Sequence, residues 1–430
     1  MKTRNVGLAF LTGALFLVGF LSSTPTAFHS GGVAECAGCH SMHNPAPNGY
    51  YLLVGTDASS TCLSCHENAG DTGPSSYHVS TVDAKLAPGL APLQRGPGGD
   101  FGWVKKTYTD TNYTENGETH GHNVVAVDKG YVADSRYDFS PGGNFPVGAL
   151  GCASCHDPHG ENRRLCDGSI AQAGNQACGG AIKASGSYYD GTDVANNEPS
   201  VTEAVGVYRL LGAAGYGQNG TGIVFQGVPA AKVNSTYNRT EASTQTRVAY
   251  GNKTSQGHVS WGKWCATCHE EMHSEENYVH PVDESLGSEV ALNYNQYVKT
   301  GDMTGSKANS FSSLVPFVEN ESDYAKLALH AVNSGNQEGP TSSDRVSCLS
   351  CHRAHASGMM YGLRYDIEYE FMTKGGMYIS KENPLVTGSR APVQRRGRTE
   401  NEWKASYYDR PATAFATYQR VLCNKCHQKD

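Results

Sequence analysis

Long apolar runs are missing from almost all of this sequence. After the N-terminus, no segment approaches the roughly 18 continuous apolar residues that a membrane-spanning helix needs, and only 17 % of the residues are charged. The formal net charge of −7 disfavours nucleic acid as a partner, because binding phosphates needs a basic face. With few long apolar stretches in 430 residues, the chain needs a second source of apolar mass for its interior.

The N-terminus has the pattern of an export signal. Lys2 and Arg4 precede an apolar run from Val6 to Leu21, and the small-residue segment Ser22–Ala27 follows it. This order is typical of a secretory signal peptide. The alternative is an uncleaved anchor, for which about 16 apolar residues is short. We predict cleavage after Ala27, so that residues 1–27 are the signal peptide and residues 28–430 form one mature domain.

Cysteine is concentrated in one repeated motif. Of the 14 cysteines, 12 lie in six C-x-x-C-H runs, the attachment signature of a c-type haem. The two thiols of a run bond covalently to the haem vinyl groups, and the adjacent histidine binds the iron. The runs, numbered first to sixth in chain order, are Cys36, Cys39 and His40; Cys62, Cys65 and His66; Cys152, Cys155 and His156; Cys265, Cys268 and His269; Cys348, Cys351 and His352; and Cys423, Cys426 and His427.

The spacing of these runs indicates the fold class. They extend from Cys36 to His427, so the whole mature chain is expected to wrap one stack of six haems as a multihaem c-type cytochrome. Six porphyrins supply the missing apolar mass, and 50 glycines let backbone pass close to flat macrocycles. We therefore predict mostly coil, few short helices and minimal strand. The expected helices are at residues 285–300, 321–333 and 412–427, and the expected short strands are at 101–104 and 123–127.

Two cysteines lie outside the haem runs. Cys166 and Cys178 have no C-x-x-C-H context, which argues against a further haem or a metal site. In an exported protein, a leftover pair of cysteines usually forms a disulfide. We predict a disulfide between them.

The second axial ligand of each iron decides between electron transfer and catalysis. Eleven of the 17 histidines remain after the six proximal ones, and Met42 or Met272 is a disfavoured alternative ligand. Three runs are followed three residues later by another histidine, and a further histidine precedes each of those runs. The following histidines are His43, His159 and His355, and the preceding ones are His29, His122 and His330.

A histidine three residues after a run is too close along the chain to reach the far face of its own haem. It can reach a neighbouring haem. We therefore predict that His159 binds the first haem iron and His355 the third. The preceding histidines are each assigned to the haem of the run after the one they precede: the second haem for His29, the fourth for His122 and the sixth for His330. The reserves are His78, His273 and His280, and the expected bystanders are His120 and His258.

This assignment leaves His43 with no haem of its own chain to serve, and it leaves the fifth haem without a second ligand. Both deficits disappear if His43 binds the fifth haem of an adjacent copy. Head-to-tail contacts that do not close generate filaments. The alternative is that His43 bonds a haem propionate while one of the reserve histidines completes the fifth haem.

Several segments resemble one family closely. The chain is similar to the outer-surface hexahaem c-type cytochromes that polymerise into extracellular conductive filaments, and it keeps all six runs in order. Cys166, Cys178, His120 and His258 depart from that family's pattern. The similar segments are Phe28–Asn44, Gly70–His78, Gly99–Tyr108, Cys152–Gly160, Ser235–Gly251, Cys348–Gly358 and Tyr418–Asp430.

The resemblance implies a loop-rich fold around a continuous stack of bis-His haems, with a cross-subunit ligand at His43. It implies a secreted, cell-surface or filament location. The implied role is long-range electron transfer to extracellular acceptors such as metal oxides, partner cells or electrodes, with outer-membrane electron-transfer proteins as partners. From the residues alone, a multihaem reductase of a small nitrogen compound is disfavoured, because all six runs end in histidine rather than, for example, lysine. A monomeric periplasmic electron shuttle shares the cofactors and lacks the assembly.

Overall fold

A computed structural model gives the architecture of the chain. It describes residues 33–43, 45–47, 50–68, 70, 77–159, 163–164, 170–171, 181–182, 203–218, 220–233, 246–252, 254, 258–273, 281–321, 324–331 and 336–427. The predicted signal peptide, the Cys166–Cys178 disulfide, His29 and His280 lie outside these residues. None of the helices in the described ranges is both long and apolar enough to cross a lipid bilayer.

Regular structure is sparse and short, as predicted for a multihaem cytochrome. The α-helices are α1 Val33–Cys39, α2 Ala58–His66, α3 Trp261–Ala266, α4 Gly287–Gln296, α5 Tyr324–His330, α6 Cys348–Cys351, α7 Ala391–Arg395, α8 Glu400–Ser406 and α9 Asn424–His427. The 3-10 helices are η1 Tyr50–Leu52, η2 Asp83–Lys85, η3 Phe101–Lys105, η4 Gly117–His120, η5 Val127–Lys129, η6 Val147–Ala149, η7 Cys152–Ser154, η8 Tyr208–Leu210, η9 Glu270–His273, η11 Lys307–Asn309, η12 Met360–Gly362 and η13 Ala412–Ala414.

The strands form small sheets. One four-stranded sheet has the order β11 (His258–Val259), β9 (Val228–Lys232), β10 (Ala249–Gly251), β12 (Val318–Glu319), and β9 is antiparallel to β10 with Tyr250 opposite Ala231. A second has the order β6 (Ile170–Ala171), β5 (Arg163–Arg164), β8 (Glu203–Gly206), β7 (Ala181–Ile182). The two-stranded pairs are β1 (Glu67–Asn68) with β2 (Ser80–Thr81), β3 (Tyr108–Asp110) with β4 (Tyr113–Glu115), and β13 (Thr373–Lys374) with β14 (Met377–Tyr378).

Two of the three predicted helices are confirmed, but both predicted strands are wrong. Residues 101–104 belong to η3, because the Asp100 carboxylate accepts the Gly102 N–H at 2.7 Å and starts a helical turn. At residues 123–127 the backbone bonds irregular segments instead of a strand, for example Val125 N–H to the Leu150 carbonyl at 2.7 Å. The helix predicted at 412–427 is limited to η13 and α9. Between them, the Met372 N–H donates to the Gln419 carbonyl at 2.7 Å and ties that segment to the chain just before β13.

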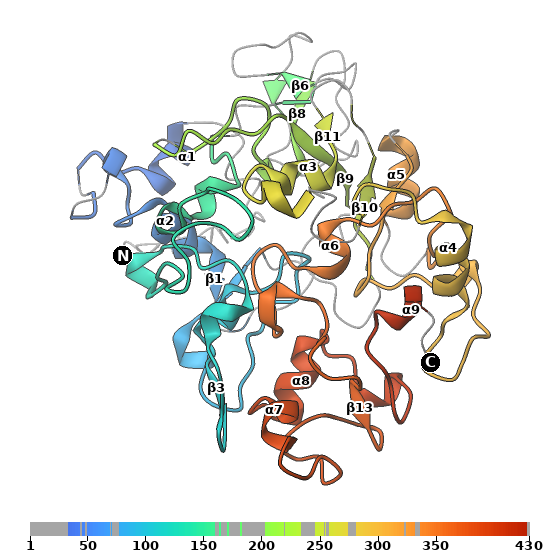
Figure 1. Cartoon of the computed structure of the whole chain (residues 1–430). Coiled ribbons are helices and arrows are strands. Elements are labelled where there is room, and N and C mark those ends of the chain that lie inside the picture. Colours follow the sequence, from blue (N-terminus) through green and yellow to red (C-terminus); the bar gives the residue numbers. More distant parts are fainter. Residues whose placement is uncertain are drawn as a thin grey trace, which may run out of the picture.

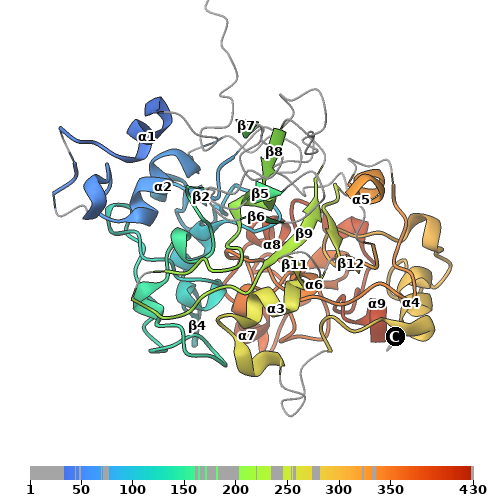
Figure 2. The same ribbon diagram turned by 90° about the horizontal axis from the view of Figure 1, so that it is seen from above.

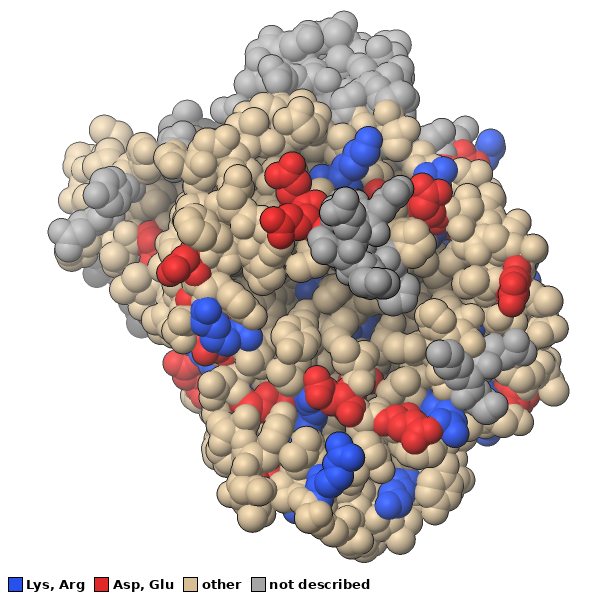
Figure 3. Space-filling view, viewed as in Figure 1, with Lys and Arg blue, Asp and Glu red and all other residues tan. Residues whose placement is uncertain are grey.

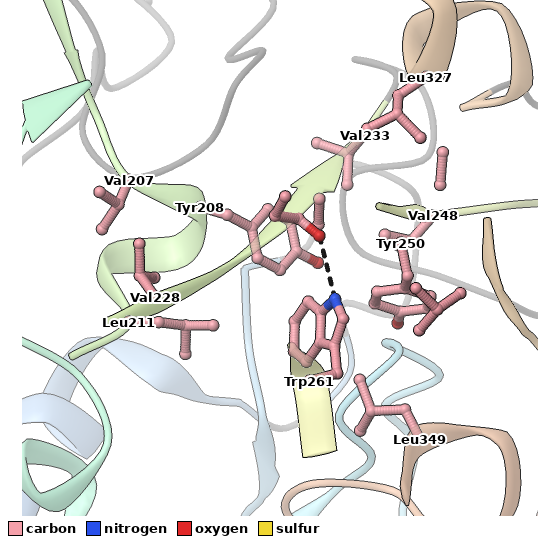
Figure 4. Close-up of a cluster of buried hydrophobic side chains, with 14 of the residues drawn as sticks. Val207, Tyr208, Leu211, Val228, Val233, Val248, Tyr250, Trp261, Leu327 and Leu349 are labelled. Carbon is pink, nitrogen blue, oxygen red and sulfur yellow. Dashed lines mark hydrogen bonds between the residues drawn. The ribbon is translucent and has the colours of Figure 1, made fainter. Parts of the chain in front are cut away.

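The buried side chains form separate clusters. The largest, shown in Figure 4, surrounds Trp261 of α3, which lies edge-on to Tyr208 and Tyr250. The Trp261 indole N–H donates to the Ala230 carbonyl at 3.0 Å and so ties α3 to β9. A second cluster, around Trp403 and Tyr407, has cysteines of the fifth and sixth runs at its edge. The interior is therefore divided among the haem runs.

The two ends of the run series lie far apart. In Figures 1 and 2, α1 with the first run lies at one side of the molecule and α9 with the sixth run lies at the opposite side. The middle of the chain, with α3 and β9, lies between them. On the face seen in Figure 3, acidic and basic side chains are scattered and mixed. This placement puts the first and last haem attachments at opposite ends.

A buried ion network joins the β3–β4 hairpin to the C-terminal part of the chain. The Glu115 carboxylate pairs with Arg396 and Arg398, and all three side chains are almost completely buried. His120 Nε2 lies 2.7 Å from Glu115 Oε1 and its Nδ1 lies 2.9 Å from the Trp103 carbonyl. Burial raises the pKa of Glu115, but Arg398, His120 and Arg396 together bring it well below its usual range. His120 therefore has a structural environment, consistent with its prediction as a bystander.

Candidate haem-iron sites

Each haem run lies at a short helix, and in two of the runs a side chain caps the start of that helix. The second run ends α2, where Asp57 caps the helix by accepting the Ser60 N–H at 2.7 Å. The fourth run spans the end of α3, where Ser260 accepts the Lys263 N–H at 3.1 Å. The others lie at α1, η7, α6 and α9. A helical turn brings the two cysteines of a run and its histidine to the same side of the backbone, as attachment to one macrocycle requires.

Haem attachment needs free thiols. None of the twelve cysteines of the runs is in a disulfide, and each keeps some exposed surface. This state fits covalent bonding of two thiols per run to a haem.

The proximal histidines share one hydrogen bond. In five runs the histidine Nδ1 lies within 2.9 Å of a backbone carbonyl oxygen, which leaves Nε2 for a metal. A bond of this kind fixes the tautomer and ring orientation and makes the ligand more basic. The pairs are His40 with Tyr51, His66 with Tyr77, His156 with Arg209, His269 with Pro141 and His352 with Tyr361.

Sequence reasoning missed the five backbone carbonyls that orient the proximal histidines, because any residue can supply a backbone carbonyl. For two of these carbonyls the sequence contains a shared short pattern. The segments Tyr50-Tyr51-Leu52-Leu53 and Tyr208-Arg209-Leu210-Leu211 share the pattern Tyr-x-Leu-Leu.

Three proximal rings face a second histidine ring. The ring centroids of His40 and His159 are 6.3 Å apart and the ring planes differ by 14°. Those of His156 and His355 are also 6.3 Å apart, and those of His122 and His269 are 6.0 Å apart. Two imidazoles bound through Nε2 to opposite sides of one metal, with metal–nitrogen bonds of about 2.0–2.1 Å as in zinc sites, have centroids about 6 Å apart. The spacing in all three pairs fits an iron between the rings.

Two of the second rings, those of His122 and His355, are held in neutral, oriented states. His122 Nδ1 lies 2.6 Å from the Ala354 carbonyl, the same arrangement as in the proximal histidines. The His355 ring stacks on Phe101 with centroids 4.6 Å apart. Burial, with neighbouring His269, lowers the pKa of His122 to about 4, and burial, with neighbouring His156, lowers that of His355 to about 3. Neutral imidazole is the form that binds a metal.

The other predicted ligands are placed differently. His43 lies in an exposed bend beside Met42, whose side chain is 80 % exposed. His330 Nδ1 is hydrogen-bonded to the Glu319 carboxylate, which leaves its Nε2 for another partner. Among the described residues, no histidine ring faces His352 in the way that His159 faces His40.

Three of the reserve and bystander histidines, His78, His120 and His258, have protein partners. The His78 ring is hydrogen-bonded by Asn68 Nδ2 at 3.1 Å, and His273 ends η9 beside the fourth run. His258 is buried, with its Nδ1 3.2 Å from the Val228 carbonyl.

Thiols of consecutive runs are neighbours in space. Cys62 of the second run and Cys152 of the third are hydrogen-bonded, which raises the pKa of Cys62. Cys265 of the fourth run and Cys348 of the fifth form an equivalent pair, which raises the pKa of Cys265. α2 packs against η7 and α3 packs against α6 at these points.

Three further pairs of neighbouring thiols complete the series. In each, burial is the main cause that raises the pKa of the first-named thiol, and the second-named thiol raises it further. The pairs are Cys39 with Cys65, Cys155 with Cys268, and Cys423 with Cys351. The six runs therefore follow one another through the molecule in chain order, from the first to the sixth.

Known proteins with the same arrangement were found by sequence and by structure. The chain is 46 % identical to the C-type cytochrome OmcS of Geobacter sulfurreducens over the full length of both proteins. The chain belongs to the OmcS family of c-type cytochromes. No family model matches the sequence.

Two solved structures of OmcS also resemble the chain. One is the Outer Membrane Cytochrome S filament from Geobacter sulfurreducens, with a TM-score of 0.80 and 46 % identity. The other is the cryo-EM structure of the OmcS nanowires, with a TM-score of 0.81 and 45 % identity. Each match covers 94 % of this chain and 100 % of the OmcS chain. As a member of the OmcS family, the protein carries covalently bound haem c, and the unbridged cysteines and paired rings described above fit that cofactor.

Proposed function

We propose that the mature chain, residues 28–430, binds six c-type haems with two histidines each and is a subunit of an extracellular filament that conducts electrons. When bound, haem supplies an iron that is reduced and oxidised without binding a substrate. The chain's own residues attach the haems, orient their ligands and exclude other ligands. The observation that carries this proposal is the set of three histidine ring pairs with centroids 6.0–6.3 Å apart.

Bis-His ligation suits electron transfer. Two histidines fill both axial positions of an iron, so no open position is left for a small molecule. Imidazole ligation also gives lower potentials than His/Met ligation, which suits the export of respiratory electrons. We assign the second axial position of the first iron to His159, that of the third to His355 and that of the fourth to His122. We assign the second iron to His29 and the sixth to His330.

The succession of runs supports conduction along the chain. Cysteines of successive runs lie near enough to influence one another's pKa, so each attachment is followed in space by the next. An electron can therefore move in short steps from the end with α1 to the end with α9 (Figures 1 and 2).

Continuation into a filament rests on His43. His43 is exposed at the first run, whereas the fifth run has, among the described residues, no histidine opposite His352. The first run therefore has a ligand to offer and the fifth run needs one. Apolar side chains surround the exposed bend: Met42 is 80 %, Tyr51 73 % and Leu52 47 % exposed. Such a surface gains free energy when a second copy covers it. His43 of one subunit would then bind the fifth haem iron of the next.

The same proposal places the protein outside the cell. The N-terminal signal directs export, and OmcS itself is described as an outer-membrane cytochrome and as a nanowire. The electron acceptors would be metal oxides, electrodes or partner cells, and the donors would be outer-membrane electron-transfer proteins.

Low-temperature electron paramagnetic resonance of the purified native protein tests the ligation. We expect only low-spin ferric haem, and no change in the reduced absorption spectrum when carbon monoxide is added. A high-spin ferric signal or a carbon monoxide shift would show an open iron and favour a reductase. Electron microscopy separates the filament from a monomeric shuttle: ribbons of uniform width support the filament, and isolated particles at all concentrations contradict it.

A further inference from the structure

The three runs of the form C-x-x-C-H-x-x-H share a second structural element, which follows each of them along the chain. The proximal histidine pairs as an isolated antiparallel bridge with a leucine: His40 with Leu53, His156 with Leu211 and His352 with Leu363. In the third run the partners lie much farther apart along the chain than in the first and fifth, so the bridge does not depend on one fixed spacing. The odd-numbered runs therefore contain a repeat that composition and motif spacing did not show.

A tight turn of one conformation precedes each of these leucines. Its two central residues are left-handed: φ is 60° and 58° at Tyr51 and Leu52, 49° and 53° at Arg209 and Leu210, and 60° and 66° at Tyr361 and Gly362. Two successive positive φ angles define a type I′ turn, which normally uses Asn and Gly. Here five of the six residues are neither Asn nor Gly. Such residues adopt this conformation only when their surroundings impose it.

The same backbone hydrogen bonds attach each turn to its run. In the fifth run, the Arg353 N–H donates to the Gly362 carbonyl at 2.7 Å and the Arg364 N–H donates to the Cys351 carbonyl at 2.7 Å. The equivalent bonds are Ser41 to Leu52 and Val54 to Cys39 in the first run, and Asp157 to Leu210 and Gly212 to Cys155 in the third, all at 2.7–2.9 Å.

The first left-handed residue of each turn is also the residue whose carbonyl meets the haem-run histidine. These are the Tyr51, Arg209 and Tyr361 carbonyls, each 2.8–2.9 Å from an Nδ1. In the second and fourth runs the carbonyl belongs to Tyr77 or Pro141, neither of which has a positive φ. The strained turn therefore belongs to the odd-numbered runs alone among these five.

We propose that each of these turns is a clamp that positions two axial ligands on two different haems. The carbonyl of its first left-handed residue orients the proximal histidine ring of its own run. Its backbone bond to the residue after that histidine fixes the segment that carries the next histidine, three residues on. Through His352 and His355, the turn at Tyr361 would act on the fifth and third haems, and the turn at Arg209 would act on the third and first. Tyr51, Arg209 and Tyr361 are positioning residues in this scheme.

The proposal rests on the bis-His ligation proposed above, and substitutions at Tyr361 test it separately. Tyr361→Gly and Tyr361→Val both remove a side chain that is 52 % exposed. Glycine adopts the left-handed conformation freely, whereas β-branched valine opposes it. The two variants therefore differ chiefly in how they hold the carbonyl. Tyr137→Val is the matched control, because Tyr137 is also exposed, at 44 %, and has no positive φ.

The readouts are the low-spin resonance signals and a potentiometric titration of the assembled, haem-loaded protein. In Tyr361→Val we expect two of six haems to change, with the fifth moving to a higher potential because its imidazole loses a hydrogen bond that makes it more basic. Tyr361→Gly and Tyr137→Val should match the parent. An unchanged Tyr361→Val, equal changes in the valine and glycine variants, or a change in a single haem would overturn the proposal.

Failure of the clamp and failure of the bis-His ligation give different results. If Tyr361→Val yields no haem-loaded protein, Tyr361→Ala takes its place, since alanine opposes the left-handed conformation less strongly. We then expect the alanine variant to alter the same two haems, and an alanine variant identical to the glycine variant contradicts the clamp. An open, high-spin iron in the unsubstituted protein would instead contradict the ligation itself, whatever the variants show.

Discussion

A single added methyl group at Gly98 should disturb one haem. A Cβ at this position would lie 2.8 Å from His355 Nδ1 and 2.9 Å from its Cε1, whereas ordinary contacts begin at 3.4 Å. The ring must therefore move by about 0.6 Å, the difference between 3.4 and 2.8 Å. Phe101 stacks on the same ring at a centroid distance of 4.6 Å and limits that movement. Overpacking of this kind costs about 1–3 kcal/mol.

For Gly98→Ala we expect a changed low-spin resonance signal and a shifted potential for the third haem, with the other five unchanged. The cause is displacement of His355 relative to His156, whose ring centroid is now 6.3 Å away. Gly148→Ala is the control, because no atom lies within 4 Å of its added Cβ and its φ is not positive. If Gly98→Ala gives stable protein with all six haem signals unchanged, His355 is not a ligand of the third haem and the assignment fails.

Three further predictions follow from other contacts. His159→Met should raise the potential of the first haem alone, because a thioether replaces an imidazole; redox titration checks this, and six unchanged haems contradict it. Glu115→Gln should cost about 3–5 kcal/mol in denaturant unfolding, because Arg398 loses its buried partner. As its comparison, Asp83→Asn should cost less than about 1 kcal/mol, since the Asp83 carboxylate that pairs with Lys105 is 72 % exposed. Because the pKa of Glu115 is lowered, its contribution to the free energy of unfolding is complete above the ordinary value of 4.5 and is lost as the pH falls. The free energy of unfolding should therefore fall less on acidification in Glu115→Gln than in the parent. Equal losses in the two proteins contradict this.

The haem runs and their histidines were the part of the site that the sequence could predict. Covalent attachment imposes a fixed local spacing, so each run is legible without structural information. Counting donors against irons paired His159 with the first run and His355 with the third, and the structure brings both ring pairs together. Counting narrows the choice because an imidazole three residues after a run can reach only a neighbouring haem.

The rest depended on contacts between distant segments. Residues 123–127 have the composition of a strand, but the preceding His122 N–H donates to the His355 carbonyl at 2.8 Å, which ties the segment to the fifth run. The left-handed turns were equally hidden, because Tyr51 and Arg209 are not residues that favour a positive φ. Tertiary contacts override local preference at these positions, and local preference is all that a single sequence displays.

Cryo-electron microscopy of the native assembly, read at the fifth haem iron, tests the central claim most directly. The account predicts an imidazole of His352 on one side of that iron and the imidazole of His43 from the adjacent subunit on the other. A water molecule, an open position or a histidine of the same chain opposite His352 would contradict it.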